Sequence, residues 1–184
     1  LSIIGAYLIR TNRPENVIRP VEKESTEMQT LKLLAGLDGA YMYRYTASDD
    51  FLSLRIYLTE YHFGKQVSKE NWELSYRDIG SPILIVPDFE NFQVKLILAD
   101  GGSKLSTSFP ILEGEENRKY FARAGASIED ETPITFESEQ PLLALMYSEN
   151  DLQVRAVQEF AAGSVSPVND YAYYISLEFC KAEQ

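Results

Sequence analysis

Residues 51–63 read FLSLRIYLTEYHF, and this stretch decides the fold class. Its side chains alternate: Leu52, Leu54, Ile56 and Leu58 are apolar, and the residues between them are mostly polar. A period of two residues predicts a β-strand with one face in a core and the other toward solvent or a second layer. At ~3.3 Å per residue the strand would be about 40 Å long, so it needs several partner strands.

Short alternating or apolar segments continue along the rest of the chain. Examples are Ala40–Thr46, Phe92–Ala99 and Tyr171–Phe179, with turn residues such as Asp100-Gly101-Gly102-Ser103 between strands. Gly64 and the polar residues after it predict a loop there. About nine or ten strands at roughly 8–12-residue spacing favour a mainly antiparallel all-β fold. We expect a β-sandwich, with a closed β-barrel as the alternative.

One segment favours a helix. Thr26–Gln29 fits a capping box with Thr26 as the N-cap, and apolar residues then recur at helical spacing. We therefore expect one short N-terminal helix over about Glu27–Ala35. The polar, proline-containing residues before it are typical of an extended connector.

The expected domain organisation follows from this change of pattern. Residues 1–39 would hold an apolar start, the connector and the helix, and residues 40–184 would form a single β-sandwich domain. The apolar start, LSIIGAYLI over residues 1–9, is too short to span a membrane, which takes about 20 residues. It is either the end of a signal or anchor that lies upstream, or a first strand. We expect an exported protein in the extracellular space or cell envelope, with the cytoplasm as the alternative.

Composition restricts the partners. The 184 residues carry a net charge of −11, which disfavours phosphate backbones and anionic lipid surfaces. We expect a protein or glycan partner, no nucleic acid, and no membrane contact by the folded body apart from the possible upstream anchor. Cys180 is the single cysteine, so an internal disulfide is impossible, and we interpret it as an ordinary thiol.

Catalytic signals are weak. His62 is the single histidine, and as a general base it would need an orienting carboxylate, such as Glu60 or Glu73, and a nucleophile. Glu137 and Glu139 alternate onto one strand face and are the most suggestive carboxylate pair for glycoside hydrolysis. Motifs for a nucleophile elbow, a phosphate loop or a zinc site are lacking. The sequence therefore predicts no catalytic residue, no metal site and no cofactor.

The aromatic residues indicate binding. Tyr57 and Tyr61 project from the polar face of the long strand, and Trp72 and Tyr76 follow with the same alternation. Exposed aromatic rings can stack on sugars or contact a protein, although the N-terminal helix could instead cover them. The leading hypothesis is a non-enzymatic domain that binds a protein or glycan through Tyr57, Tyr61, Trp72 and Tyr76. The alternatives are a carbohydrate-active hydrolase with two carboxylates and an assembly protein that acts through a sheet edge.

Overall fold

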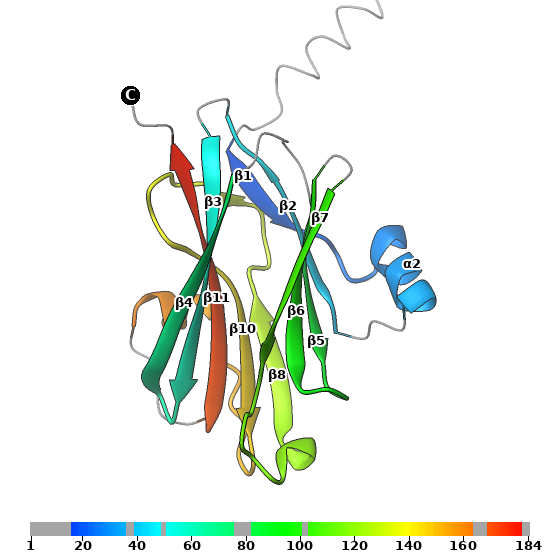
Figure 1. Cartoon of the computed structure of the whole chain (residues 1–184), viewed down its shortest axis with the longest axis vertical. Helices are drawn as coiled ribbons and strands as arrows, with labels where there is room; N and C mark the ends of the chain where they lie inside the picture. The colour runs from blue at the N-terminus through cyan, green and yellow to red at the C-terminus, as the bar shows by residue number, and fades with distance from the viewer. Residues whose placement is uncertain are drawn as a thin grey trace, which may run out of the picture.

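Two antiparallel β-sheets face each other across a shared core in the computed structural model (Figure 1). The structure describes residues 16–35, 39–48, 51–75, 82–100, 103–163 and 169–181. Because the strands pair into two separate sheets, the predicted sandwich is confirmed and the alternative of a closed barrel is not. The predictions for residues 1–9 and for Tyr76 concern residues outside the described ranges.

Sheet B is built around the long strand predicted from residues 51–63. Its order is β4-β3-β11-β10-β8. The strands are β3 (Phe51–His62), β4 (Lys65–Ser75), β8 (Ala122–Ser127), β10 (Gln140–Ser148) and β11 (Tyr171–Lys181). A tight turn at Phe63 and Gly64, both with positive φ, joins β3 to β4. The polar residues after Gly64 therefore belong to a strand, where a loop was predicted. Their polarity suits the edge of a sheet, which solvent reaches.

Sheet A has the order β7-β6-β5-β2-β1-β9. The strands are β1 (Val17–Pro20), β2 (Tyr41–Thr46), β5 (Ile83–Asp88), β6 (Gln93–Asp100), β7 (Ser103–Pro110) and β9 (Thr132–Pro133). Strand β1 replaces part of the predicted connector, because Val17 and Ile18 are buried in the sandwich. It pairs with both β2 and β9. Residues before 39 thus contribute a strand to the sheet that residues 40–184 build.

The predicted helix is present as α2 (Thr26–Ala35), and it lies on the outer face of sheet A (Figure 1). Its first turn is capped one residue earlier than predicted, since the hydroxyl of Ser25 accepts a hydrogen bond from the amide of Met28 at 3.2 Å. Met28 and Leu31 pack with Met42 and Val86. The helix therefore covers sheet A and leaves the outer face of β3 to another segment.

That other segment is α3 (Val157–Ala161), which packs against β10. The ring of Phe160 stacks on Tyr174 at 5.7 Å and meets the edge of Tyr61 at 5.9 Å. The third helical piece is the 3-10 turn η1 (Arg118–Tyr120). Within the described ranges, none of the helices has the length and apolar character needed to cross a membrane.

The inner faces of the two sheets supply the core. Leu54, Ile56 and Leu58 of β3 are buried as the alternation predicted, whereas Leu52, at the register irregularity near the start of β3, is 51% exposed. Each of the three buried residues lies beside a buried apolar residue of β11: Phe179, Leu177 and Ile175 respectively. At the opposite end of sheet B, β8 has little apolar surface to bury, and this is where the sandwich is open.

Candidate functional site

A hollow of about 920 Å³ lies between the β8 end of sheet B and the β1–β2 part of sheet A. We call it the β8 groove. Its lining comes from segments far apart in the chain: residues 19–23, 40–43, 125–132 and 154–158. Polar and apolar surfaces both contribute to the lining.

Tyr41 and Gly125 meet in the groove. A Cβ atom on Gly125 would lie 2.0 Å from the hydroxyl oxygen of Tyr41, so the tyrosine rests where only glycine leaves room. Burial raises the pKa of the Tyr41 hydroxyl, which keeps it protonated and able to donate a hydrogen bond. Lys23 places its ammonium nitrogen 5.1 Å from the centre of the Tyr41 ring. These contacts hold an aromatic side chain across the inner face of β8.

The outer backbone edge of β8 is the second feature of the groove. Among the described residues β8 pairs only with β10, and it ends the order of sheet B. Every second residue of an edge strand directs its N–H and C=O away from the sheet. The lining includes Tyr41 and Tyr43 from the inner side of β8 and Val154–Gln158 from the other side. Because both sides contribute, the hollow opens along the edge of the strand.

Charges of both signs stand around the groove. Arg19 forms an ion pair with Glu131, and Arg155 lies 3.8 Å from the carboxylate of Glu159. Glu22, Lys23, Glu129 and Asp130 add further charges to the lining. Mixed charge suits a polar or mixed-charge segment better than a polyanion. The lining contains no histidine and no cysteine, the two side chains that most often serve as base or thiol nucleophile.

Of the four aromatic residues predicted to bind, the three that the structure describes do not gather in one place. Tyr57 and Tyr61 lie on the outer face of sheet B. There Phe160 packs against Tyr61 and buries it. Trp72 pairs with Ile56 and stacks on Phe109 at 6.4 Å, so it faces the other sheet. Tyr57 and Tyr61 thus share no surface with Trp72. Binding by these aromatic residues as one surface stays a prediction, and this geometry does not favour it.

Tyr57 is held in a polar network on the outer face. Its hydroxyl donates a hydrogen bond to Glu178, and the ammonium of Lys69 lies 4.7 Å from the ring centre. Burial, followed by the bond to Glu178, raises the pKa of Tyr57 to about 12. Arg55 lies within 3.7 Å of the same carboxylate. These partners fix the ring in the sheet and reduce the area that a ligand could reach.

The residues considered for catalysis are engaged in separate contacts. His62 lies 2.8 Å from Glu60 and 4.6 Å from the ring centre of Tyr171, outside the groove. Glu73 accepts hydrogen bonds from Ser53 and Arg55. A histidine with an orienting carboxylate still needs a nucleophile. These contacts of His62, with Glu60 and the ring of Tyr171, add no serine, threonine or cysteine to it.

The two carboxylates considered for glycoside hydrolysis, Glu137 and Glu139, also bind different partners. Glu139 accepts hydrogen bonds from Ser176 at 2.5 Å and Lys69 at 2.6 Å. Glu137 accepts one from the backbone amide of Lys181 at 2.5 Å. Glu137 therefore contacts the end of β11, whereas Glu139 contacts the middle of β11 and strand β4.

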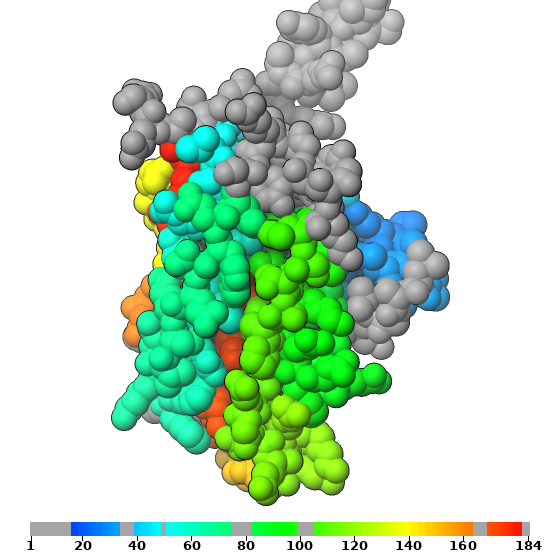
Figure 2. Space-filling model, viewed as in Figure 1, coloured from blue at the N-terminus to red at the C-terminus, as the bar shows by residue number. Residues whose placement is uncertain are grey.

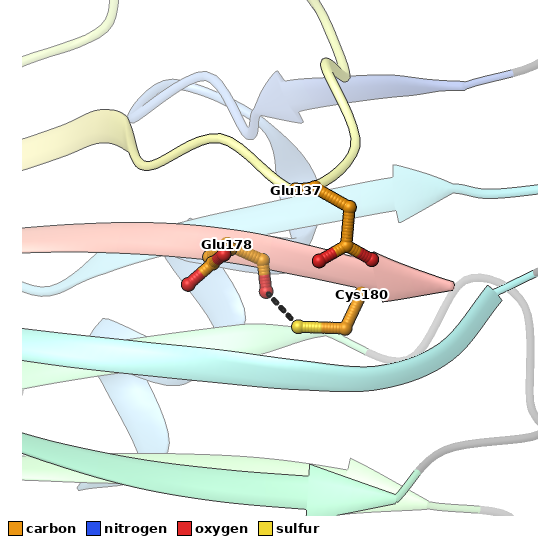
Figure 3. A group of neighbouring side chains, drawn as sticks. All are labelled: Glu137, Glu178 and Cys180. Carbon is orange, nitrogen blue, oxygen red and sulfur yellow. Dashed lines mark hydrogen bonds between the residues drawn. The ribbon is translucent and has the colours of Figure 1, made fainter. Parts of the chain in front are cut away.

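Glu137, Glu178 and Cys180 bring three potential metal-ligating atoms within 4.8 Å of one another (Figure 3). All three groups already have partners within the protein. The carboxylate of Glu137 bonds the amide of Lys181, and that of Glu178 bonds Tyr57. The thiol of Cys180 points toward the carbonyl oxygen of Glu178 at 3.9 Å. Burial raises the pKa of this thiol, whereas metal binding needs the thiolate. The arrangement fits a packed strand end better than a metal centre.

Sequence reasoning missed the β8 groove. The segment ARAGAS over residues 122–127 carries no apolar alternation that would indicate a strand. A run of small residues beside a tyrosine-rich strand was the one available signal. No family model, curated protein or solved structure matches this chain, so the function has to be argued from its own geometry.

Proposed function

We propose that this chain is a non-enzymatic binding domain that takes an extended segment of another protein into the β8 groove. The observation that carries the proposal is the position of the hollow, along the open backbone edge of a strand. An extended peptide that adds to a sheet edge gains main-chain hydrogen bonds, and pockets on either side select alternate side chains.

The dimensions of β8 suit this mode. The groove lining includes Gly125–Ser127 of β8, and the six residues of the whole strand extend over about 20 Å, enough for five or six ligand residues. Ala122, Ala124, Gly125 and Ala126 are small, so a second backbone can approach without displacing large side chains. Side chains of the ligand would alternate between the Tyr41 side and the Val154–Gln158 side.

A protein ligand has more support than a glycan. A surface that binds a sugar by stacking presents its aromatic rings in a row on one face. Tyr57 and Trp72 instead lie on opposite faces of sheet B. The proposed setting remains the extracellular space or cell envelope, with the cytoplasm as the alternative, and it rests on the apolar residues 1–9. Protease digestion of an epitope-tagged chain on intact and lysed cells distinguishes the two.

The binding test uses two exposed apolar residues as a matched pair. Val154 lines the groove and is 64% exposed, and Leu105 lies on β7, outside the groove lining, and is 43% exposed. Extended peptides selected from a random display library on the unmodified chain are the probes. We expect Val154→Arg to weaken the binding of these peptides by at least about tenfold, because it places a new charge in the groove. Leu105→Arg should leave it unchanged, and equal effects of both variants would refute the proposal.

A further inference from the structure

Strand β4 ends sheet B on the side opposite the β8 groove, and among the described residues it pairs only with β3. The space-filling view shows β4 at the surface of the molecule beside β7 (Figure 2). The two edges of sheet A carry proline: β7 ends at Pro110 and β9 consists of Thr132 and Pro133. β4 has eleven residues and no proline. A long edge without proline is open to pairing with another strand.

We propose that β4 pairs with the β4 strand of a second copy of this chain, antiparallel, about a two-fold axis at Asn71. This interaction is separate from the proposed ligand groove. It would join the two copies of sheet B into one continuous sheet and leave both β8 edges at its outer ends. Closed two-fold pairing of identical surfaces is the commonest form of homo-oligomer.

The faces of β4 restrict the possible registers. Lys69, Asn71 and Glu73 lie opposite Thr59, Tyr57 and Arg55 of β3, so they share the outer face of sheet B. Glu70, Trp72 and Leu74 share the inner face. A two-fold axis perpendicular to the sheet keeps outer residues on the outer face. Each allowed register therefore centres on one residue of β4 that meets its own copy.

Charge selects among these registers. Centring on Asn71 places Lys69 directly opposite Glu73 of the second copy, and this pair occurs twice. Centring on Lys69, Glu70 or Glu73 places two like charges opposite each other on the axis. Opposite charges at directly opposed positions stabilise paired strands, and like charges destabilise them.

The shape of β4 agrees with the same centre. The register with β3 shifts between Glu60 and Tyr61, which leaves Val67 as an extra residue on β4. The regular part runs from Ser68 to Ser75, so Asn71 lies next to its midpoint. Each half of this part carries one member of the charge pair, with Lys69 on one side of Asn71 and Glu73 on the other.

Existing ion pairs extend this pattern across the outer face. Lys69 bonds Glu139 at 2.6 Å, and Glu73 bonds Arg55 at 3.2 Å. In the proposed pair Lys69 would face Glu73 of the second copy, which is backed by that copy's Arg55. Signs would alternate along the row, so the internal partners of both residues are compatible with the contact between copies.

Complementary charge reversals test the proposal. Lys69→Glu alone places negative charges opposite each other, and Glu73→Lys alone places positive charges opposite each other. We expect sedimentation velocity to show a dimer for the unmodified chain and at least about a tenfold weaker one for each variant. Mixing the two variants restores opposite charges at both positions, so a heterodimer should form with nearly the original affinity.

The mixture separates pairing between copies from damage within one copy. Loss of the bonds from Lys69 to Glu139 or from Glu73 to Arg55 is not repaired by adding the other variant. A monomeric unmodified chain, or a mixture that fails to associate, would overturn the proposal. As a second readout, Asn71→Cys in a Cys180→Ala background should form a covalent dimer on oxidation, and Leu105→Cys in that background should not.

Discussion

The hydroxyl oxygens of Tyr43 and Ser127 lie 2.7 Å apart and join the two sheets beside the β8 groove. Tyr43 comes from β2 in sheet A, and Ser127 is the last residue of β8 in sheet B. Ser127 also donates a hydrogen bond to the carbonyl oxygen of Ile128 at 2.9 Å. The edge strand that borders the groove is thus tied to the opposite sheet by polar contacts as well as by its pairing with β10.

Tyr43→Phe should lower the free energy of unfolding by about 0.5–1.5 kcal/mol, the usual net value of one hydrogen bond. Tyr43 is almost fully buried, so the ring has to stay in place when its hydroxyl is removed. Urea unfolding followed by fluorescence measures the change. Ser127→Ala should cost less in the Tyr43→Phe background than in the unmodified chain, where it also removes the contact with Tyr43, and fully additive losses would show that the two hydroxyls do not interact.

Gly125→Ala should destabilise the fold by about 1–3 kcal/mol, because the new methyl group collides with the hydroxyl of Tyr41. Gly125 does not adopt a positive φ, so alanine itself introduces no backbone strain there. In a Tyr41→Ala background the same substitution should cost clearly less. Equal losses in both backgrounds, measured by urea unfolding, would contradict the close contact.

Ile56→Ala should cost about 2–5 kcal/mol, as expected for a buried aliphatic side chain in a packed core. Tyr57→Ala, at the next position, should cost less, since Tyr57 is only partly buried on the outer face. Tyr57→Phe separates the ring from the hydroxyl that bonds Glu178. Chemical denaturation of the three variants compares the two faces of β3, and equal losses for Ile56→Ala and Tyr57→Ala would mean that both faces are covered.

Stability should fall as the pH rises above about 10, the ordinary pKa of an unfolded tyrosine. Burial, assisted by hydrogen bonds to Glu178 and Glu115, raises the pKa values of Tyr57 and Tyr171 to about 12. A raised pKa means that the folded state holds the proton more tightly, so the contribution to stability is complete below pH ~10 and is lost as the pH passes ~12.

Urea unfolding at several pH values between about 9 and 11.5 measures this loss, and absorbance at the tyrosinate band reports ionisation. Replacing Tyr57 and Tyr171 together by Phe should reduce the slope, and the slope that remains comes from Tyr43, Tyr147, Tyr173 and Tyr174, whose pKa values are also raised by burial. If the double variant loses stability with the same slope as the unmodified chain, other groups cause the alkaline sensitivity.

Strand alternation made the sandwich predictable, because residues such as Leu54 and Ile56 face the core at every second position. Strand β1 escaped prediction because it is only four residues long and includes Pro20. Strand β8 escaped for a different reason: an edge strand packed under Tyr41 needs small residues rather than an apolar alternation.

The groove could not be predicted because it depends on contacts between distant segments. Tyr43 and Ser127 are 84 residues apart in sequence, and nothing local to either residue indicates the other. The sequence assigned Tyr57 and Tyr61 correctly to a strand. The position of α3 over Tyr61 follows from the chain path after β10, which side-chain periodicity does not encode.

Hydrogen–deuterium exchange on the backbone amides of β8 tests the central claim most directly. A selected extended peptide that adds to the edge of sheet B should slow exchange at outward-pointing amides within Ala122–Ser127 and leave β4 unchanged. The same peptide should protect β8 poorly in the Val154→Arg variant. Tight peptide binding with unchanged exchange throughout Ala122–Ser127 would contradict the account.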